Sequence, residues 1–155
     1  MHLLYSKIAK EEIDKNRFLV DTIKDDNIKN RFKTSLEWFI EKSVKAKYWF
    51  FVFSVITIIT PVISSIILDL QDCDCIIKIS VSILSALTSI SASFLNLFSC
   101  RNNWILYRNQ AEKIKHILAI HINNPDYTEE KMLNDLESST AFTDETFIKN
   151  TEKKQ

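Results

Sequence analysis

The chain has 155 residues, and its 20 Lys and Arg balance its 20 Asp and Glu, so the formal net charge is zero. It contains no glycine, two prolines, three cysteines and three histidines. The absence of glycine excludes Gly-rich phosphate loops and Rossmann turns, and the Cys and His residues lack the paired spacing of a zinc finger. A neutral chain gives no reason to expect nucleic acid as a partner. The composition favours an all-α protein.

The first predicted element is an amphipathic helix over about residues 3–23, within an N-terminal segment 1–27. A second helix is expected to begin at an N-cap, Asp26 or Asn27, and to reach about Leu68. Pro61 is expected to kink this helix, because proline removes one backbone hydrogen bond.

A third helix is predicted to run without interruption from about residue 79 to 122, where Asn123, Asn124 and Pro125 end it. Asp126 and Glu129 have the spacing of a capping box, which predicts a short helix ending near Leu136. The remainder of segment 123–155 is acidic and is predicted to be partly disordered.

Two runs without charged side chains, 48–68 and 79–100, lie in the middle of segment 28–122. At about 1.5 Å per residue, a helix of either run crosses a hydrocarbon core of about 30 Å. A soluble core helix of this length normally carries charge on one face. The runs therefore predict a transmembrane hairpin with a connecting loop at 69–78, and a soluble four-helix bundle is the alternative.

Basic residues flank the hairpin on one side. Lys42, Lys45 and Lys47 precede the first run and Arg101 and Arg108 follow the second, whereas the loop has one lysine against three aspartates. The positive-inside rule then places both termini in the cytoplasm of a multi-pass membrane protein.

Small polar residues follow one face of each predicted span. They are Ser54 and Thr57 in the first span and Ser85, Ser89, Ser93 and Asn96 in the second. Such a stripe indicates a surface that faces other protein, either a dry helix-packing seam or the lining of a pore in a homo-oligomer. We favour packing for most of the hydroxyls and leave both interpretations open for Asn96, because a carboxamide in lipid needs a partner or water. Outside the spans the same helical phase collects largely apolar residues, which predicts that Phe32 before the first span and Ala111, Ile114 and Leu118 after the second face other protein in water.

No catalytic triad, carboxylate pair or metal-ligand set can be assembled from the sequence, so no enzyme activity and no cofactor are predicted. Cys73 and Cys75 lie two residues apart in the predicted loop, where a disulfide between them would be strained. Intermolecular pairing or free thiols are expected instead.

The chain resembles the bacterial two-transmembrane SLATT superfamily, in particular a member described as a domain of unknown function. The resemblance covers about residues 30–147. It rests on the segment LEWFIEKS at 36–43, a first span containing Pro61, and a motif after the second span that includes Trp104, Tyr107, Arg108, Ala111, Glu112 and Lys115.

This resemblance implies a membrane effector of a bacterial conflict or anti-phage system, which oligomerises and permeabilises the inner membrane when a cytoplasmic sensor or signalling protein activates it. Residues expected to couple the signal to the membrane are Trp38, Trp104, Tyr107, Arg108 and Ala111. The alternative is a non-conducting membrane scaffold or sensor subunit that recruits a soluble partner.

Overall fold

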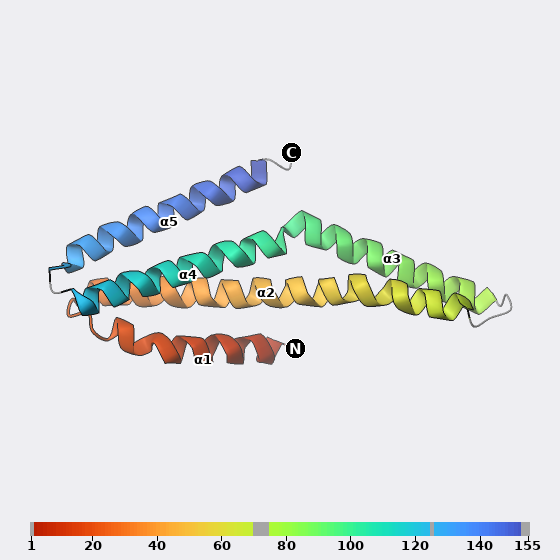
Figure 1. The fold of residues 1–155 in the computed structure, drawn as a ribbon, viewed down its shortest axis with the longest axis horizontal. Coiled ribbons are helices and arrows are strands. Elements are labelled where there is room, and N and C mark those ends of the chain that lie inside the picture. Colours follow the sequence, from red (N-terminus) through yellow and green to blue (C-terminus); the bar gives the residue numbers. More distant parts are fainter. Residues whose placement is uncertain (1, 70–74, 125, 153–155) are drawn as a thin grey trace. The chain divides into compact units, whose positions relative to one another are not determined.

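The computed structural model describes the backbone of residues 2–69, 75–124 and 126–152, and the side chains of 5–68, 78–124 and 126–141. Within these ranges every regular element is a helix, as the composition predicts. The helices are α1 (His2–Val20), α2 (Asp26–Asp69), α3 (Cys75–Phe98), α4 (Cys100–Asn123) and α5 (Glu129–Glu152) (Figure 1).

The helices form two compact units. One unit, here called the bundle, comprises Met1–Lys45 and Trp104–Gln155; the other, the hairpin, comprises Ala46–Asn103. Helix α2 contributes its first part to the bundle and the rest to the hairpin, because it runs without a break from Asp26 to Asp69.

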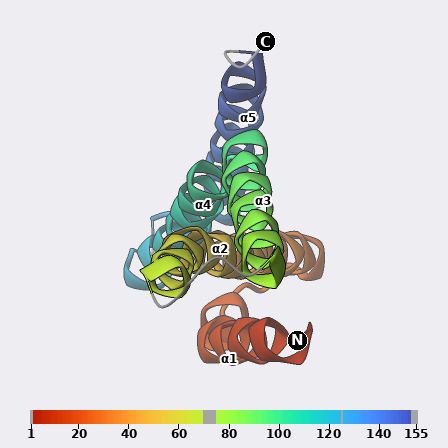
Figure 2. The ribbon, with the colours of Figure 1, turned by 90° about the vertical axis from the view of Figure 1, so that its right-hand side faces the viewer.

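The bundle has a continuous apolar core. In Figures 1 and 2, α1 and α5 lie on opposite sides of the pair formed by α4 and the first part of α2. All four helices supply buried side chains, which include Ala9, Val20, Phe32, Leu36, Ile40, Ala111, Ile114, Leu118, Met132 and Leu136. The apolar stripe predicted for α2 and α4 outside the membrane is confirmed, because Phe32, Ala111, Ile114 and Leu118 are fully enclosed.

The hairpin has the opposite distribution of apolar side chains. Only 6% of the most apolar window of each long helical segment is buried, and both segments are long and apolar enough to span a membrane. Large side chains such as Ile58, Ile66, Ile83, Ile90 and Leu97 are each more than half exposed. A hairpin that contacts lipid needs this surface, whereas a core helix of a soluble protein buries it.

The second long helix contains a break that the sequence did not predict. Ser99 adopts a positive φ of 44° and separates α3 from α4, so the expected uninterrupted helix over 79–122 is wrong at this residue. Asn103 stabilises the break, because its side-chain amide donates to the Phe98 carbonyl at 2.9 Å and its backbone N–H donates to the Ser99 carbonyl at 3.0 Å. Local side-chain hydrogen bonds of this kind compete with regular helical geometry.

The start of α2 lies within one residue of its predicted position. Asp25 is the N-cap, since its carboxylate accepts hydrogen bonds from the backbone N–H groups of Asn27 at 2.8 Å and Ile28 at 3.2 Å. Helix α4 ends at Asn123, as the following residues predict. Helix α2 continues through Pro61, and the kink expected there stays a prediction.

The prediction of a short final helix is wrong. Helix α5 begins at Glu129 and continues to Glu152, because no glycine or proline follows to stop it. Thr128, rather than Asp126, caps its first turn: its hydroxyl and carbonyl accept from the backbone N–H groups of Lys131 at 3.5 Å and Met132 at 3.1 Å. The thiols of Cys73 and Cys75 lie outside the described residues.

Candidate functional site

The polar stripe predicted on the second span lies on the surface of the hairpin. Ser85, Ser89, Ser93 and Asn96 are all exposed side chains of α3, and Ser54 and Thr57 of α2 are half-buried. The Ser89 hydroxyl donates to the Ser85 carbonyl at 3.0 Å, and the Thr57 hydroxyl donates to the Phe53 carbonyl at 2.8 Å. Such bonds to the preceding turn let hydroxyls exist in an apolar setting without a partner on another helix.

Other residues make the contact between the two hairpin helices. The hydroxyls of Thr60 and Thr88 lie 2.7 Å apart, and the rings of Phe53 and Phe94 have centroids 4.2 Å apart. Ser91 is 1% exposed, although it lies only two residues after the exposed Ser89. A step of two residues turns a helix by about 200°, so the packing face and the polar stripe lie on different sides of α3.

Three of the predicted coupling residues come together in the bundle. The Trp38 ring packs edge-on against Phe39 and Tyr107, with centroid separations of 4.9 and 5.7 Å, and Ala111 is fully buried one turn after Tyr107. Burial raises the pKa of the Tyr107 hydroxyl. Trp104, which lies one turn before Arg108 on α4, is half-buried.

The fifth predicted coupling residue, Arg108, belongs to a cluster of four charges. Its Nη1 atom lies 2.6 Å from Glu12 Oε1 and 2.8 Å from Oε2, and its Nη2 atom lies 2.7 Å from Glu112. Lys115 Nζ lies 2.7 Å from Glu12 and 3.1 Å from Glu112. Two cations and two carboxylates balance, and Glu12 is the only member from α1.

The electrostatic surroundings of Glu12 favour its ionised form. Burial acts to raise the pKa of its carboxyl group, but the hydrogen bond and charge of Lys115 and the charge of Arg108 outweigh burial and lower the pKa below the ordinary value of 4.5. Lys115 is 15% exposed and Glu12 20% exposed, so this pairing is shielded more than a typical surface ion pair. The cluster therefore joins α1 to α4.

Sequence reasoning missed Glu12, although part of the pattern was visible. Arg108 and Glu112 are spaced i,i+4 and Glu112 and Lys115 i,i+3, as expected for ion pairs along one helix face. Nothing in the local sequence indicates that a residue 96 positions earlier completes the set.

Hydrogen bonds hold α5 to the rest of the bundle. The Gln110 side chain donates to the Ser139 carbonyl at 2.9 Å, and the Ser139 hydroxyl donates back to Gln110 at 2.6 Å. The Tyr127 hydroxyl donates to Asp135. Burial and the neighbouring Asp135 carboxylate raise the pKa of Tyr127 to about 12.

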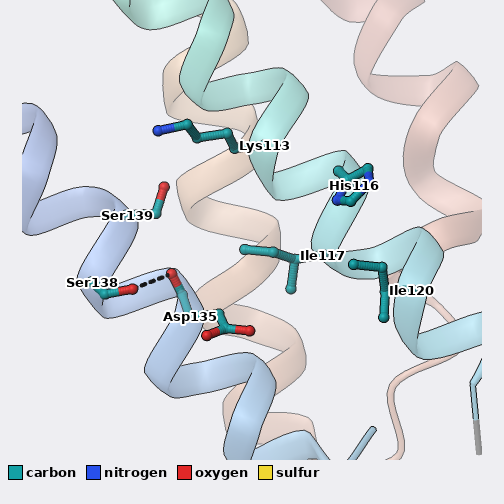
Figure 3. A pocket seen from close by; sticks show the side chains of 7 residues that line it. All are labelled: Lys113, His116, Ile117, Ile120, Asp135, Ser138 and Ser139. Carbon is teal, nitrogen blue, oxygen red and sulfur yellow. Dashed lines mark hydrogen bonds between the residues drawn. The ribbon is translucent and has the colours of Figure 1, made fainter.

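A hollow of about 450 Å³ lies between α4 and α5 (Figure 3). Its lining comprises Lys113, His116, Ile117 and Ile120 from α4 and Asp135, Ser138 and Ser139 from α5. The polar groups of α5 are already engaged, because Asp135 accepts from Tyr127, Ser138 donates to the Asp135 carbonyl and Ser139 pairs with Gln110. Within the described side chains, no group of three His, Cys, Asp or Glu is arranged to hold a metal ion.

Comparison with known proteins identifies a family. The family model described as "Protein of unknown function (DUF4231)" matches residues 34–119, which comprise most of α2, all of α3 and most of α4. No curated protein and no solved structure matches the chain. Because the matched segment covers more than half of the sequence, the chain belongs to the DUF4231 family of proteins of unknown function.

Proposed function

We propose that this protein is an integral membrane effector of a bacterial conflict or anti-phage system. In this proposal several hairpins associate in the inner membrane and permeabilise it, and the bundle lies in the cytoplasm and controls that association in response to a signal. The resemblance to the SLATT superfamily supports the biological setting, and the physical arguments below support the mechanism.

The observation that carries the proposal is the exposure of the α3 stripe. Ser85, Ser89 and Ser93 lie away from the helix contacts of Thr60 with Thr88 and of Phe53 with Phe94, and with Asn96 they form an exposed polar stripe on a helix whose other exposed side chains are largely apolar. Small hydroxylated side chains gain nothing from contact with lipid, whereas helices of another copy can pack closely against them. A second copy of the hairpin is therefore the proposed neighbour of this face.

The bundle supplies an element with which a signal can act. Its charged cluster fastens α1 to α4, and charged contacts of this kind can be exchanged for others at a cost of a few kcal/mol. In the proposal, a cytoplasmic sensor or signalling protein shifts the bundle between two packings. The aromatic contact of Trp38 with Tyr107 is the proposed route from the first part of α2 to α4.

Membrane leakage tests the permeabilising activity. We expect expression of the chain in bacteria to collapse the membrane potential, measured with a voltage-sensitive dye, and Asn96→Leu to reduce the effect. Asn96→Ser is the matched control, since it keeps a polar side chain at the same position. An unchanged potential at high expression, with the protein shown to be in the membrane fraction, would refute the proposal.

Cysteine crosslinking tests the proposed interface directly. In a background with Cys73, Cys75 and Cys100 replaced by Ser, we expect Ser89→Cys and Ser93→Cys to form disulfide-linked dimers in membranes. Leu87→Cys and Ile90→Cys are controls on other exposed parts of α3. Equal crosslinking at all four positions would exclude a specific stripe interface. Recovery of a stoichiometric soluble partner without leakage would favour the scaffold alternative.

A further inference from the structure

The groove between α1 and the first part of α2 has the composition of a phosphate site. It has a volume of about 250 Å³ and is lined by Tyr5, Ser6 and Ala9 from α1 and by Glu41, Lys42 and Lys45 from α2. Its lining thus includes two lysines and two residues with hydroxyl groups, against one glutamate. Ammonium and hydroxyl donors are the groups that bind phosphate oxygens in proteins.

The two lysines of the groove differ from three other cations of the bundle, Lys29, Arg31 and Arg108, in how their charge is balanced. Lys29, Arg31 and Arg108 each lie within 3.0 Å of a carboxylate. No described carboxylate forms an ion pair with Lys42 or Lys45, and the Lys42 ammonium lies 5.4 Å from the centroid of the Trp38 ring. An aromatic face positions a cation without neutralising it, so the charge of Lys42 stays available to an anion.

The position of the groove along α2 indicates where that anion comes from. Lys45 lies three residues before Tyr48, at which the charge-free run begins, and α2 is helical throughout this region. Three residues of helix rise about 4.5 Å, less than the depth of a lipid headgroup layer. If the hairpin spans the bilayer, Lys45 is therefore level with the headgroups.

We propose that this groove binds the phosphate of an anionic phospholipid headgroup between Lys42 and Lys45, with the Ser6 hydroxyl as a further donor. The inference rests on the membrane insertion of the hairpin, but not on oligomerisation or permeabilisation.

The test measures binding of short-chain lipids to the full chain purified in a non-ionic detergent. Thermophoresis would follow titration with dioctanoyl phosphatidylglycerol, dioctanoyl phosphatidylcholine and inorganic phosphate. We expect phosphatidylglycerol to bind most tightly, since the choline ammonium of phosphatidylcholine is repelled by both lysines. Equal binding of inorganic phosphate would overturn the assignment to a lipid.

Substitutions separate the groove from the general charge of this region. Lys42→Gln and Lys45→Gln should each weaken phosphatidylglycerol binding about five-fold, and together about 25-fold. Lys47→Gln is the matched control, because Lys47 has the same charge and lies only about 3 Å further along α2 than Lys45 but does not line the groove. Its effect should be less than two-fold. If Lys47→Gln weakened phosphatidylglycerol binding as much as Lys45→Gln does, the binding would reflect the general positive charge of this region, and the proposal would be overturned.

Two more variants act on the groove without removing a lysine. Ser6→Leu should fill it and weaken binding while leaving every charge in place, and Glu41→Gln should strengthen binding about five-fold by removing the carboxylate. Circular dichroism would verify that each variant is folded. Unchanged binding in Ser6→Leu would contradict the proposed location. All these binding measurements use protein in detergent. A protein that does not permeabilise membranes can therefore still bind the lipid, and the two proposals can fail separately.

Discussion

The substitution Glu12→Gln tests whether the charged cluster fastens α1 to the bundle. It keeps the size of the side chain but removes the carboxylate that contacts both Arg108 and Lys115. A charge-assisted hydrogen bond contributes about 1.5–3 kcal/mol, whereas an exposed ion pair contributes about 0.2–1 kcal/mol. Glu12 is 20% exposed, and Glu112 remains to pair both cations. We therefore expect a loss of about 2 kcal/mol in the stability of α1 packing.

Hydrogen exchange of the backbone amides in α1 is the appropriate assay, because it reports local opening separately from global unfolding. A loss of about 2 kcal/mol corresponds to exchange about 30-fold faster in α1. Glu11→Gln is the matched control, since Glu11 precedes Glu12 on α1 and is exposed, with no ion pair to any described residue. It should change exchange by less than two-fold.

The pH dependence provides an independent test of the same reasoning. The folded-state pKa of Glu12 lies below its ordinary value of 4.5, so the folded protein binds fewer protons than the unfolded chain in this range. The contribution of Glu12 is complete above about pH 4.5 and is lost as the pH falls through the folded-state pKa. The difference between wild type and Glu12→Gln should therefore shrink in acid. Equal exchange in Glu12→Gln and Glu11→Gln, or a difference independent of pH, would refute the reasoning.

Three other predictions concern the helix break, the last helix and the core. At Ser99, the positive φ should reverse the usual preference for alanine in a helix, so thermal unfolding of Ser99→Gly should indicate about 1 kcal/mol more stability than Ser99→Ala; a more stable alanine variant would contradict a left-handed residue there. The raised pKa of Tyr127 should make folding less stable as the pH rises from 10 to about 12, and Tyr127→Phe should remove this part of the alkaline loss in a pH titration of unfolding. Leu118→Ala should cost about 2–5 kcal/mol, measured by chemical unfolding, because Leu118 is fully buried; a loss below 1 kcal/mol would show that the bundle core is loosely packed.

The features that the sequence predicted correctly depend on repeated local patterns. The charge-free runs identify the hairpin helices, and the 3.6-residue repeat identifies Phe32, Ala111 and Leu118 as core residues. Each of these signals is repeated over several turns, so one ambiguous residue does not remove it. Cap residues predicted the start of α2 to within one residue of the observed N-cap, Asp25, and stop residues predicted the end of α4.

The features that were missed depend on single residues or distant contacts. The break at Ser99 has no glycine or proline to mark it, because the backbone there is stabilised by the Asn103 side chain. The contact of Glu12 with Arg108 joins residues 96 positions apart. Helix α5 extends beyond Leu136, where Ser139 pairs with Gln110, a tertiary contact that composition does not reveal. On α3, Thr88 and Ser91 lie at the face that packs on α2, and only the fold distinguishes them from the exposed serines of the predicted stripe.

The hydroxyl groups of Thr60 and Thr88 have fewer protons than hydrogen-bond contacts. Thr60 and Thr88 each have one hydroxyl proton. Three hydrogen bonds need such a proton: the bond between the two hydroxyls, the bond from Thr60 to the Ile56 carbonyl and the bond from Thr88 to the Leu84 carbonyl. Two protons cannot form three hydrogen bonds at once. When the two threonines bond to each other, one of the backbone carbonyls therefore loses its hydrogen bond from a threonine hydroxyl. Drawing the helices apart restores that bond. When α2 and α3 slide or separate within the hairpin, each threonine hydroxyl can therefore still donate to a carbonyl of its own helix.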